Sequence, residues 1–224
     1  MIVLIFVMAG LLIILLVIAF SVSQGSVLTT APFPVGNLGE DVILDCNFQT
    51  KTGQISSGVS ITWQKDGLTG VVDQYQNKVD NLQQNPQFKN RVGLFPDAIL
   101  KGNASLLLRM VNTDDAGVYR CSVAAPGVMG TVSIHLRVGA FSAPNISMSN
   151  NDRLIAVAQR WLPQPDVTWT DENGMLLNSS NYFNKTDMGI VQVISSLLDQ
   201  VTKGKYTCVI QNDLVTSVTE ATVT

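Results

Sequence analysis

Two cysteines and a tryptophan constrain this chain more than any other feature. Cys46 and Cys121 stand 75 residues apart, and Trp63 lies between them. Each cysteine lies in a stretch of alternating apolar and polar residues, "EDVILDCNF" and "GVYRCSV", and is in phase with the apolar ones. Alternation places every second side chain on one face of a β-strand. We therefore expect two strands that both point a cysteine toward a core.

The rest of residues 26–139 has the same character. Further short alternating stretches include "VSITW", "NASLLLRM" and "GTVSIHLRV". Sequences rich in turn-forming residues separate them, such as "KDGLTG" and "APGVMG". No stretch after residue 25 shows a sustained helical period. Regular short strands with turns between them indicate an all-β fold, an antiparallel sandwich or barrel.

The cysteine–tryptophan–cysteine order narrows this fold to the immunoglobulin sandwich. In that fold a disulfide joins the two sheets, a tryptophan packs on it, and a tyrosine stands two residues before the second cysteine. We predict a Cys46–Cys121 disulfide with Trp63 packed against it. The long separation of the cysteines leaves room for the two extra edge strands of a variable-type domain, which we place in residues 70–90.

The segment "DDAGVYRC" predicts a tyrosine corner before the second cysteine. The hydroxyl of Tyr119 is expected to turn back to the backbone of the corner, and Gly117 is expected to allow a close approach. Asp115 is predicted to cap the turn and to form a salt bridge with Arg91 in "NRVGLF".

Residues 140–224 repeat the plan in a shorter form, typical of a constant-type immunoglobulin domain. Trp169 and Cys208 occupy the expected positions, and Tyr206 in "KYTC" repeats the tyrosine corner. Counting back from the tryptophan, the first cysteine should lie in "RLIAVA", where Ala156 is the best candidate. We therefore expect Cys208 to be a buried free thiol; an intermolecular disulfide is the alternative.

The N-terminal segment indicates that the chain leaves the cytosol. Residues 1–25 hold an apolar run of about 20 residues and no charged side chain. We interpret them as a signal peptide cut after Ser23; an uncleaved N-terminal anchor is the alternative. Four Asn-x-Ser/Thr sequences agree with a secretory route and predict N-glycosylation. Their asparagines are Asn103, Asn145, Asn178 and Asn184.

Composition argues against several functions. The net charge of −3 gives no reason to expect a nucleic acid or an anionic membrane surface as partner. His135 is the only histidine, and with three cysteines it provides no zinc-binding spacing. No glycine-rich phosphate loop follows a strand, and the acidic pairs lie in turns. We expect no enzymatic activity, no cofactor and no metal.

Longer strings resemble one family. "VGNLGEDVILDC", "FKNRVGLFPDAILKGNASLLLRMVNTDDAGVYRC", "VGAFSAP" and "QRWLPQPDVTW" are similar to the butyrophilin-related costimulatory and coinhibitory ligands of T cells. The likeness covers nearly the whole chain after the leader. It implies a cell-surface or secreted glycoprotein that dampens T-cell activation by binding a protein receptor on T cells.

The sequence departs from that family in two places. The constant-type domain lacks the first cysteine of its expected disulfide. Family members also have a C-terminal membrane attachment, and none is visible here. The chain is therefore expected to be a fragment, a secreted isoform or a paralogue tethered by its N-terminal segment.

The sheet that holds Trp63 and Cys121 is the expected binding surface, because its outer face is flat and rimmed by loops. Side chains out of phase with the core would form a receptor face. The candidates are Thr62, Gln64, Tyr75, Arg120, Ser122, Val128 and Met129. For the last two, which we place on a turn, folding back onto their own domain is the alternative. An adhesion or structural protein that associates with copies of itself is the alternative function.

Overall fold

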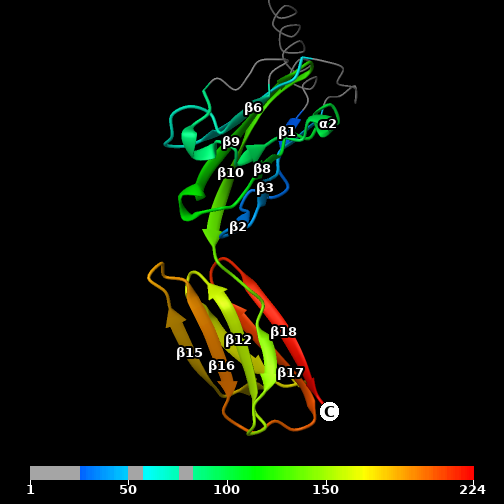
Figure 1. Cartoon of the computed structure of the whole chain (residues 1–224). Helices are drawn as coiled ribbons and strands as arrows, with labels where there is room; N and C mark the ends of the chain where they lie inside the picture. Colours follow the sequence, from blue (N-terminus) through cyan, green and yellow to red (C-terminus); the bar gives the residue numbers. More distant parts are fainter. Residues whose placement is uncertain (1–25, 50–57, 76–82) are drawn as a thin grey trace, which may run out of the picture. The chain divides into compact units, whose positions relative to one another are not determined.

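The computed structural model describes residues 26–49, 58–75 and 83–224 (Figure 1). They form two compact units. The first unit ends at residue 136 and leaves out the segments 35–40 and 111–114, which belong with residues 137–224 to the second. The predicted leader lies outside the described residues. Among the residues that are described, no helix is long and apolar enough to cross a membrane. The boundary at residue 139 stays a prediction.

A sheet of five strands has the order β2-β10-β9-β5-β6; its strands β9, β5 and β6 and most of β10 belong to the first unit. All neighbours are antiparallel except β2 and β10, which run parallel. The strands are β2 (Val35–Asn37), β5 (Ser60–Lys65), β6 (Asp73–Tyr75), β9 (Gly117–Ala125) and β10 (Val128–Gly139). Strand β6 lies where we placed the two extra edge strands of a variable-type domain. Part of that segment, residues 76–82, lies outside the described residues.

Shorter strands form the opposite side of the first unit, a sheet in the order β3-β8-β7 and a β1-β4 pair. These strands are β1 (Ser26–Leu28), β3 (Val42–Leu44), β4 (Asn47–Gln49), β7 (Val92–Gly93) and β8 (Leu106–Leu108). The short helical turns among the described residues are η1 (Pro86–Phe88), α2 (Pro96–Ile99) and η2 (Thr113–Asp115).

A disulfide joins the two sides of this unit. Cys46 and Cys121 are bonded, with their Cα atoms 6.5 Å apart. Trp63 is completely buried, and its indole Nε1 donates a hydrogen bond to the carbonyl oxygen of Ala104 at 2.9 Å. The apolar faces of the alternating strands thus pack together as a sandwich, with the Cys46–Cys121 disulfide and the Trp63 indole in its core.

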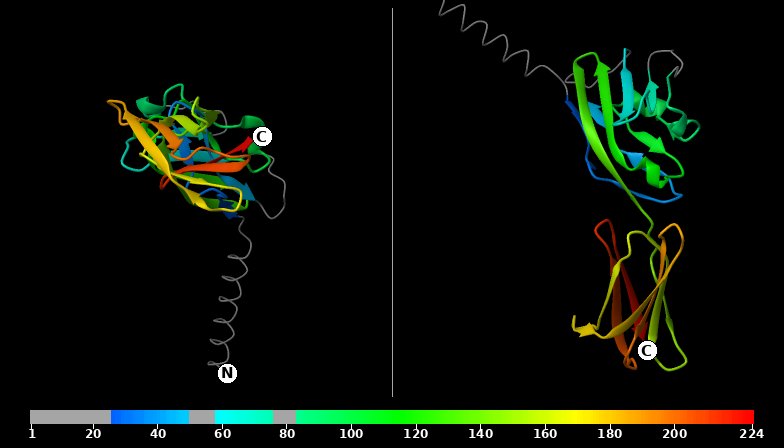
Figure 2. Two further views of the ribbon diagram at one scale, coloured as in Figure 1. Left: turned by 90° about the horizontal axis from the view of Figure 1, so that it is seen from below. Right: turned by 90° about the vertical axis from the view of Figure 1, so that its left-hand side faces the viewer.

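The second unit contains two four-stranded sheets, β11-β12-β16-β15 and β14-β13-β17-β18. The side view in Figure 2 separates them. The strands are β11 (Asn145–Met148), β12 (Leu154–Trp161), β13 (Asp166–Thr170), β14 (Leu176–Leu177), β15 (Ser179–Lys185), β16 (Val191–Leu197), β17 (Gly204–Gln211) and β18 (Thr216–Val223). The predicted all-β class is confirmed for both units.

Cys208 is a buried free cysteine in the core of the second unit. Ala156, from the other sheet, is also completely buried and belongs to the same core cluster. That cluster also includes Trp161, which is completely buried. The second core therefore has no disulfide between its sheets.

Candidate binding face

Four of the predicted residues lie on the neighbouring strands β5 and β9. Thr62 is paired directly with Ser122, and Gln64 with Arg120. Directly paired residues lie on the same face of a sheet. Trp63, between Thr62 and Gln64, is buried, so these four side chains share the outer face. We call the outer face of strands β10, β9, β5 and β6 the front face.

The register adds residues that the sequence analysis did not name. Ser122 is also paired with Thr131 of β10, and their hydroxyl oxygens are 2.9 Å apart. Thr62 is also paired with Gln74 of β6. One uncharged polar row thus crosses four strands. Alternation alone could not find this row, because it gives the phase of one strand and not the pairing of two.

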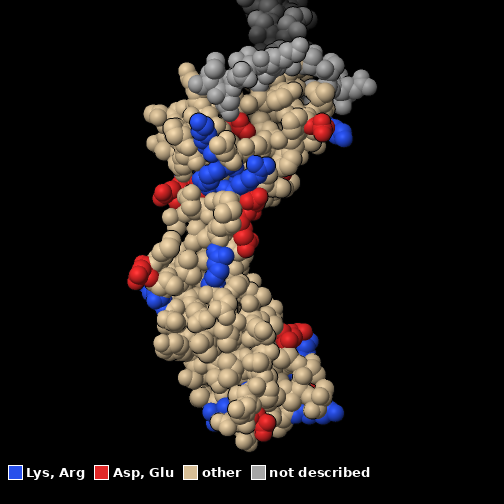
Figure 3. All heavy atoms as spheres, in the orientation of Figure 1, with Lys and Arg blue, Asp and Glu red and all other residues tan. Residues whose placement is uncertain are grey.

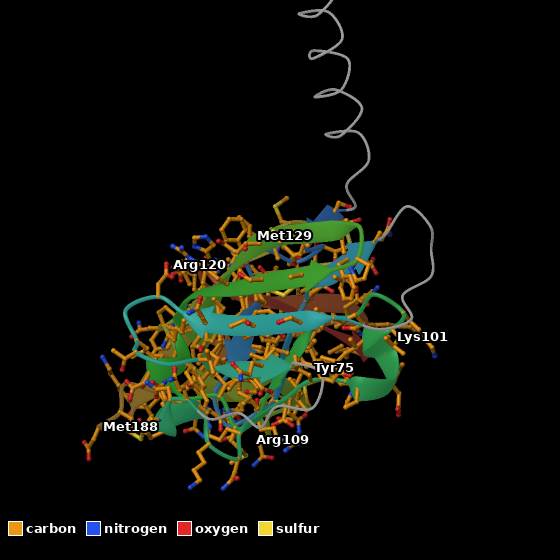
Figure 4. The ribbon with its side chains drawn as sticks, turned by 90° about the horizontal axis from the view of Figure 1, so that it is seen from above. Tyr75, Lys101, Arg109, Arg120, Met129 and Met188 are labelled. Atoms are coloured by element: carbon orange, nitrogen blue, oxygen red, sulfur yellow. A yellow bond between two sulfur atoms is a disulfide. The ribbon has the colours of Figure 1, made fainter. Side chains whose placement is uncertain are left out.

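Tyr75 is wrongly placed by the sequence analysis. The register pairs it with Ile61 of β5, which is completely buried. Tyr75 therefore lies on the inner side of the sheet, and its neighbour Gln74 occupies the front face. In Figure 4 Tyr75 lies on the edge strand β6, and strands β5 and β9 lie between it and the β10 strand that carries Met129.

Val128 is a second correction. Strand β10 begins at Val128, so Val128 and Met129 belong to a strand and not to a turn. Val128 is 3% exposed, whereas Met129 is 74% exposed. Alternation along β10 explains the difference, since adjacent side chains point to opposite faces. Only Met129 remains a candidate for the front face.

A shallow hollow of about 190 Å³ opens on the front face beside Met129. Small side chains on three adjacent strands leave this space. The lining residues are Ser60, Thr62, Ser122, Val123, Ala124, Met129, Gly130 and Thr131. Met129 is in register with Ala124, and Ala124 with Ser60, so a large thioether side chain stands next to two short ones. The hollow can accept a small apolar or hydroxylated group of a partner.

The other end of the front face carries charge. Arg120 Nε lies 2.9 Å from Asp66 Oδ1, and the two side chains are 53% and 43% exposed. A pair this exposed contributes about 0–1 kcal/mol to stability. It does hold the guanidinium at the surface beside Gln64. The front face therefore changes from small and apolar near Met129 to charged near Arg120.

Comparison with known proteins identifies both domains. The family model of the immunoglobulin V-set domain matches residues 30–138, and the butyrophilin subfamily 3 member A2-like Ig-C domain matches residues 141–219. The V-set domain-containing T-cell activation inhibitor 1 of Rattus norvegicus is 33% identical over 94% of this chain and 78% of its own. The Homo sapiens protein of that name is 32% identical over 93% of this chain and 77% of its own. The chain belongs to the family of V-set domain-containing T-cell activation inhibitors.

This result confirms the resemblance seen in the sequence and the order of a variable-type and then a constant-type immunoglobulin domain. The crystal structure of bovine butyrophilin has a TM-score of 0.57 at 23% identity, covering 89% of this chain and 99% of that chain. At that identity the likeness shows the fold alone.

The tyrosine corner around Tyr119 holds in place the start of β9, one of the strands of the front face. The Tyr119 hydroxyl donates to the carbonyl oxygen of Asp115 at 2.8 Å, and burial raises the pKa of the tyrosine. Arg91 Nη2 lies 2.5 Å from Asp115 Oδ2. Gly117 has a φ of 143°, and a Cβ there would lie 3.0 Å from Lys65 Cε. The corner thus fixes the start of β9, from which Arg120 and Ser122 project.

The second unit has a matching corner, in which the Tyr206 hydroxyl donates to the carbonyl oxygen of Thr202 at 3.1 Å.

The predicted glycosylation sites differ in exposure. Asn145, Asn178 and Asn184 are exposed. Asn103 is half-buried, and its side-chain oxygen accepts a hydrogen bond from the Ser105 backbone at 2.8 Å. None of the four lies on the front face.

Proposed function

We propose that this protein is an extracellular immunoglobulin-superfamily ligand that binds a protein receptor on T cells and negatively regulates T-cell activation. In this proposal the front face of the first unit docks the receptor, and the second unit acts as a spacer. In this proposal the protein acts by binding its receptor and catalyses no reaction. The protein would act at the cell surface or after secretion.

The arrangement of the front face carries this proposal. Interfaces are enriched in Met and Arg, and their energetic anchors tend to lie beside pockets that exclude water. The front face presents Met129 beside the hollow and Arg120 at the other end. It also holds none of the four sequons of the chain, so no attached glycan would start from it. The names of the relatives supply the cell type and the sign of the signal.

Staining of activated T cells tests the proposal. Residues 26–224, clustered as a multimer to amplify weak contacts, should bind the cells and reduce their proliferation. Met129→Glu places a charge beside the hollow and should lower binding about tenfold or more.

Ile43→Glu is the matched control. Ile43 is 53% exposed and lies on β3, in the opposite sheet of the same unit. This variant should bind as the natural sequence does. Equal loss of binding in both variants would contradict the assignment of the front face, and enhanced proliferation would contradict the inhibitory sign.

Self-association is the alternative function, and the front face would serve it equally well. Analytical ultracentrifugation of residues 26–224 separates the two. Strong self-association without staining of activated T cells would favour an adhesion protein.

A further inference from the structure

One sheet of the second unit exposes apolar residues to its outer side. In β12, Ile155 and Val157 alternate with residues that are buried in the core, such as Ala156. In β16, Ile194 alternates in the same way with Val193. The three branched side chains are half-buried and lie outside the core cluster. Tyr182 of β15, which is paired with Ile194, is 63% exposed.

The regularly paired outward positions of this sheet carry no charge; the charged residue Arg160 lies beside them in the bulge between Ala158 and Trp161 of β12. The outward positions of the sheet β11-β12-β16-β15 are Asn145, Ser147, Ile155, Val157, Gln159, Ser180, Tyr182, Asn184, Gln192, Ile194 and Ser196. We call this surface the uncharged face. Figure 3 shows a wide area over the second unit without Lys, Arg, Asp or Glu.

The other sheet of the same unit is different. Its outward positions include Asp166 on β13, and a 2.8 Å ion pair joins Lys205 Nζ of β17 to Glu220 Oε2 of β18. Charges of this kind are the usual means by which an exposed sheet stays solvated and free of contacts. An apolar row on the outer side of a sheet that lacks such charges is a candidate for a surface that something covers.

Two predicted glycosylation sites lie at opposite edges of the uncharged face. Asn145 is on the edge strand β11 and is paired with Val157, which is paired with Ile194, which is paired with Tyr182. Asn145 therefore begins a row whose other members are apolar or aromatic. Asn184 is on the opposite edge strand, β15, paired with Gln192 of β16. Both asparagine side chains are exposed and point to the uncharged face.

We propose that N-linked glycans on Asn145 and Asn184 lie across the uncharged face and cover its apolar row. The inference rests on the extracellular location in the proposed function. In each attachment the amide Nδ2 forms a bond to the anomeric carbon of a lipid-pyrophosphate-linked oligosaccharide. The bond from that carbon to the pyrophosphate breaks, the lipid pyrophosphate leaves, and the amide nitrogen loses one proton.

A glycan suits this surface better than a second copy of the chain. Sugar rings present C–H faces to Val157, Ile194 and Tyr182 and hydroxyl groups to water. Two sheets that pack face to face are only about 10 Å apart. Bulky groups that start from both edges of the face would occupy that space. The uncharged face is therefore a shielded surface, which leaves protein recognition to other surfaces of the molecule.

Expression of the whole chain in mammalian cells tests the inference. Release of glycans by an amidase in heavy-oxygen water, followed by mass spectrometry, identifies the occupied asparagines. Hydroxyl-radical footprinting then compares the natural protein with the Asn145→Gln/Asn184→Gln variant. We expect both sites to be occupied, and the oxidation rate at Tyr182 and Ile194 to rise several-fold in the variant.

Two controls define the comparison. Val218, 59% exposed on the charged sheet of the same unit, should be oxidised equally in both proteins. The variant Ser147→Ala/Thr186→Ala removes both sequons without changing an asparagine, and it should reproduce the rise at Tyr182.

Three outcomes would overturn the inference: Asn145 and Asn184 unoccupied, unchanged oxidation of Tyr182, or a dimer that protects Tyr182 in the absence of glycans. The last would assign the uncharged face to a second copy. Occupancy at Asn103 or Asn178 separates this failure from failure of the proposed function. Glycans at Asn103 or Asn178 but not at the two edge sites would overturn only the proposal that glycans cover the uncharged face. If no asparagine of the chain carried a glycan, the extracellular location in the proposed function would be contradicted as well.

Discussion

Cys208 and Trp169 stand directly opposite each other on the paired strands β17 and β13, and both are completely buried. The indole Nε1 of Trp169 donates to Ser195 Oγ of the opposite sheet at 2.9 Å. The second core thus has a tryptophan against a thiol, where the first core has a tryptophan against a disulfide. In the second core the hydrogen bond from Trp169 to Ser195 connects the two sheets, which in the first core are connected by the disulfide.

The thiol of Cys208 should be unreactive in the folded protein. Burial raises the pKa of this thiol from 9.0 to about 12, and the thiolate is the reactive form. A chromogenic disulfide reagent at mildly alkaline pH should label Cys208 only after unfolding. Equally fast labelling of the folded and the unfolded protein would contradict the buried position.

The same pKa difference predicts a pH dependence of stability. The folded state holds the proton more tightly than the unfolded state, so this contribution is fully present below pH 9.0 and is lost as pH rises toward about 12. The free energy of unfolding, measured with denaturant, should fall across that window. Cys208→Ala should show a shallower fall, and identical slopes would contradict the prediction.

Ala156→Cys should supply the missing disulfide. Ala156 and Cys208 are buried in the same core cluster and come from opposite sheets. We expect the new bond to raise the free energy of unfolding by about 2–4 kcal/mol without reductant. The matched control is Ile155→Cys, whose side chain points away from the core. A thiol label on Cys208 in the unfolded, unreduced Ala156→Cys variant would show that the register is wrong.

The sequence predicted the cores well because their residues have few substitutes. A cysteine pair, a buried tryptophan and a tyrosine corner are distinctive in kind and spacing, so Cys46, Trp63 and Cys121 could be recognised over a long separation. The alternating strands β9 and β12 are eight residues or longer, which also makes their phase readable.

The binding face was harder to predict because its short elements carry too little pattern. Strand β6 has three residues, and a shift of one residue exchanges the inward and outward positions, which is how Tyr75 was assigned in place of Gln74. Val128 was assigned to a turn because Pro126 and Gly127 precede it. Strand pairing, which brings Thr131 beside Ser122, depends on tertiary structure and leaves no local signal.

The Arg91–Asp115 pair should contribute strongly to stability. The side chain of Asp115 is 0% exposed and that of Arg91 is 20% exposed. Arg91→Ala leaves a buried carboxylate without its ion-pair partner, so we expect a loss of about 3–5 kcal/mol in the free energy of unfolding.

Arg120→Ala is the matched control, because the Arg120–Asp66 pair is exposed and should cost less than about 1 kcal/mol. Denaturant unfolding of both variants measures the two values. Similar losses would mean that the tyrosine corner does not depend on its ion pair.

Val128 and Met129 are neighbours in β10, but the same substitution should destabilise the fold strongly at Val128 and hardly at all at Met129. Val128→Asp buries a carboxylate among apolar side chains and should lower the free energy of unfolding by more than about 2 kcal/mol. Met129→Asp changes a side chain that is 74% exposed and should shift stability by no more than about 0.5 kcal/mol. Thermal unfolding of the two variants gives the comparison, with loss of binding to T cells expected for Met129→Asp at unchanged stability. If Met129→Asp destabilises the fold as much as Val128→Asp, then Met129 packs against its own domain and the front face loses its apolar anchor.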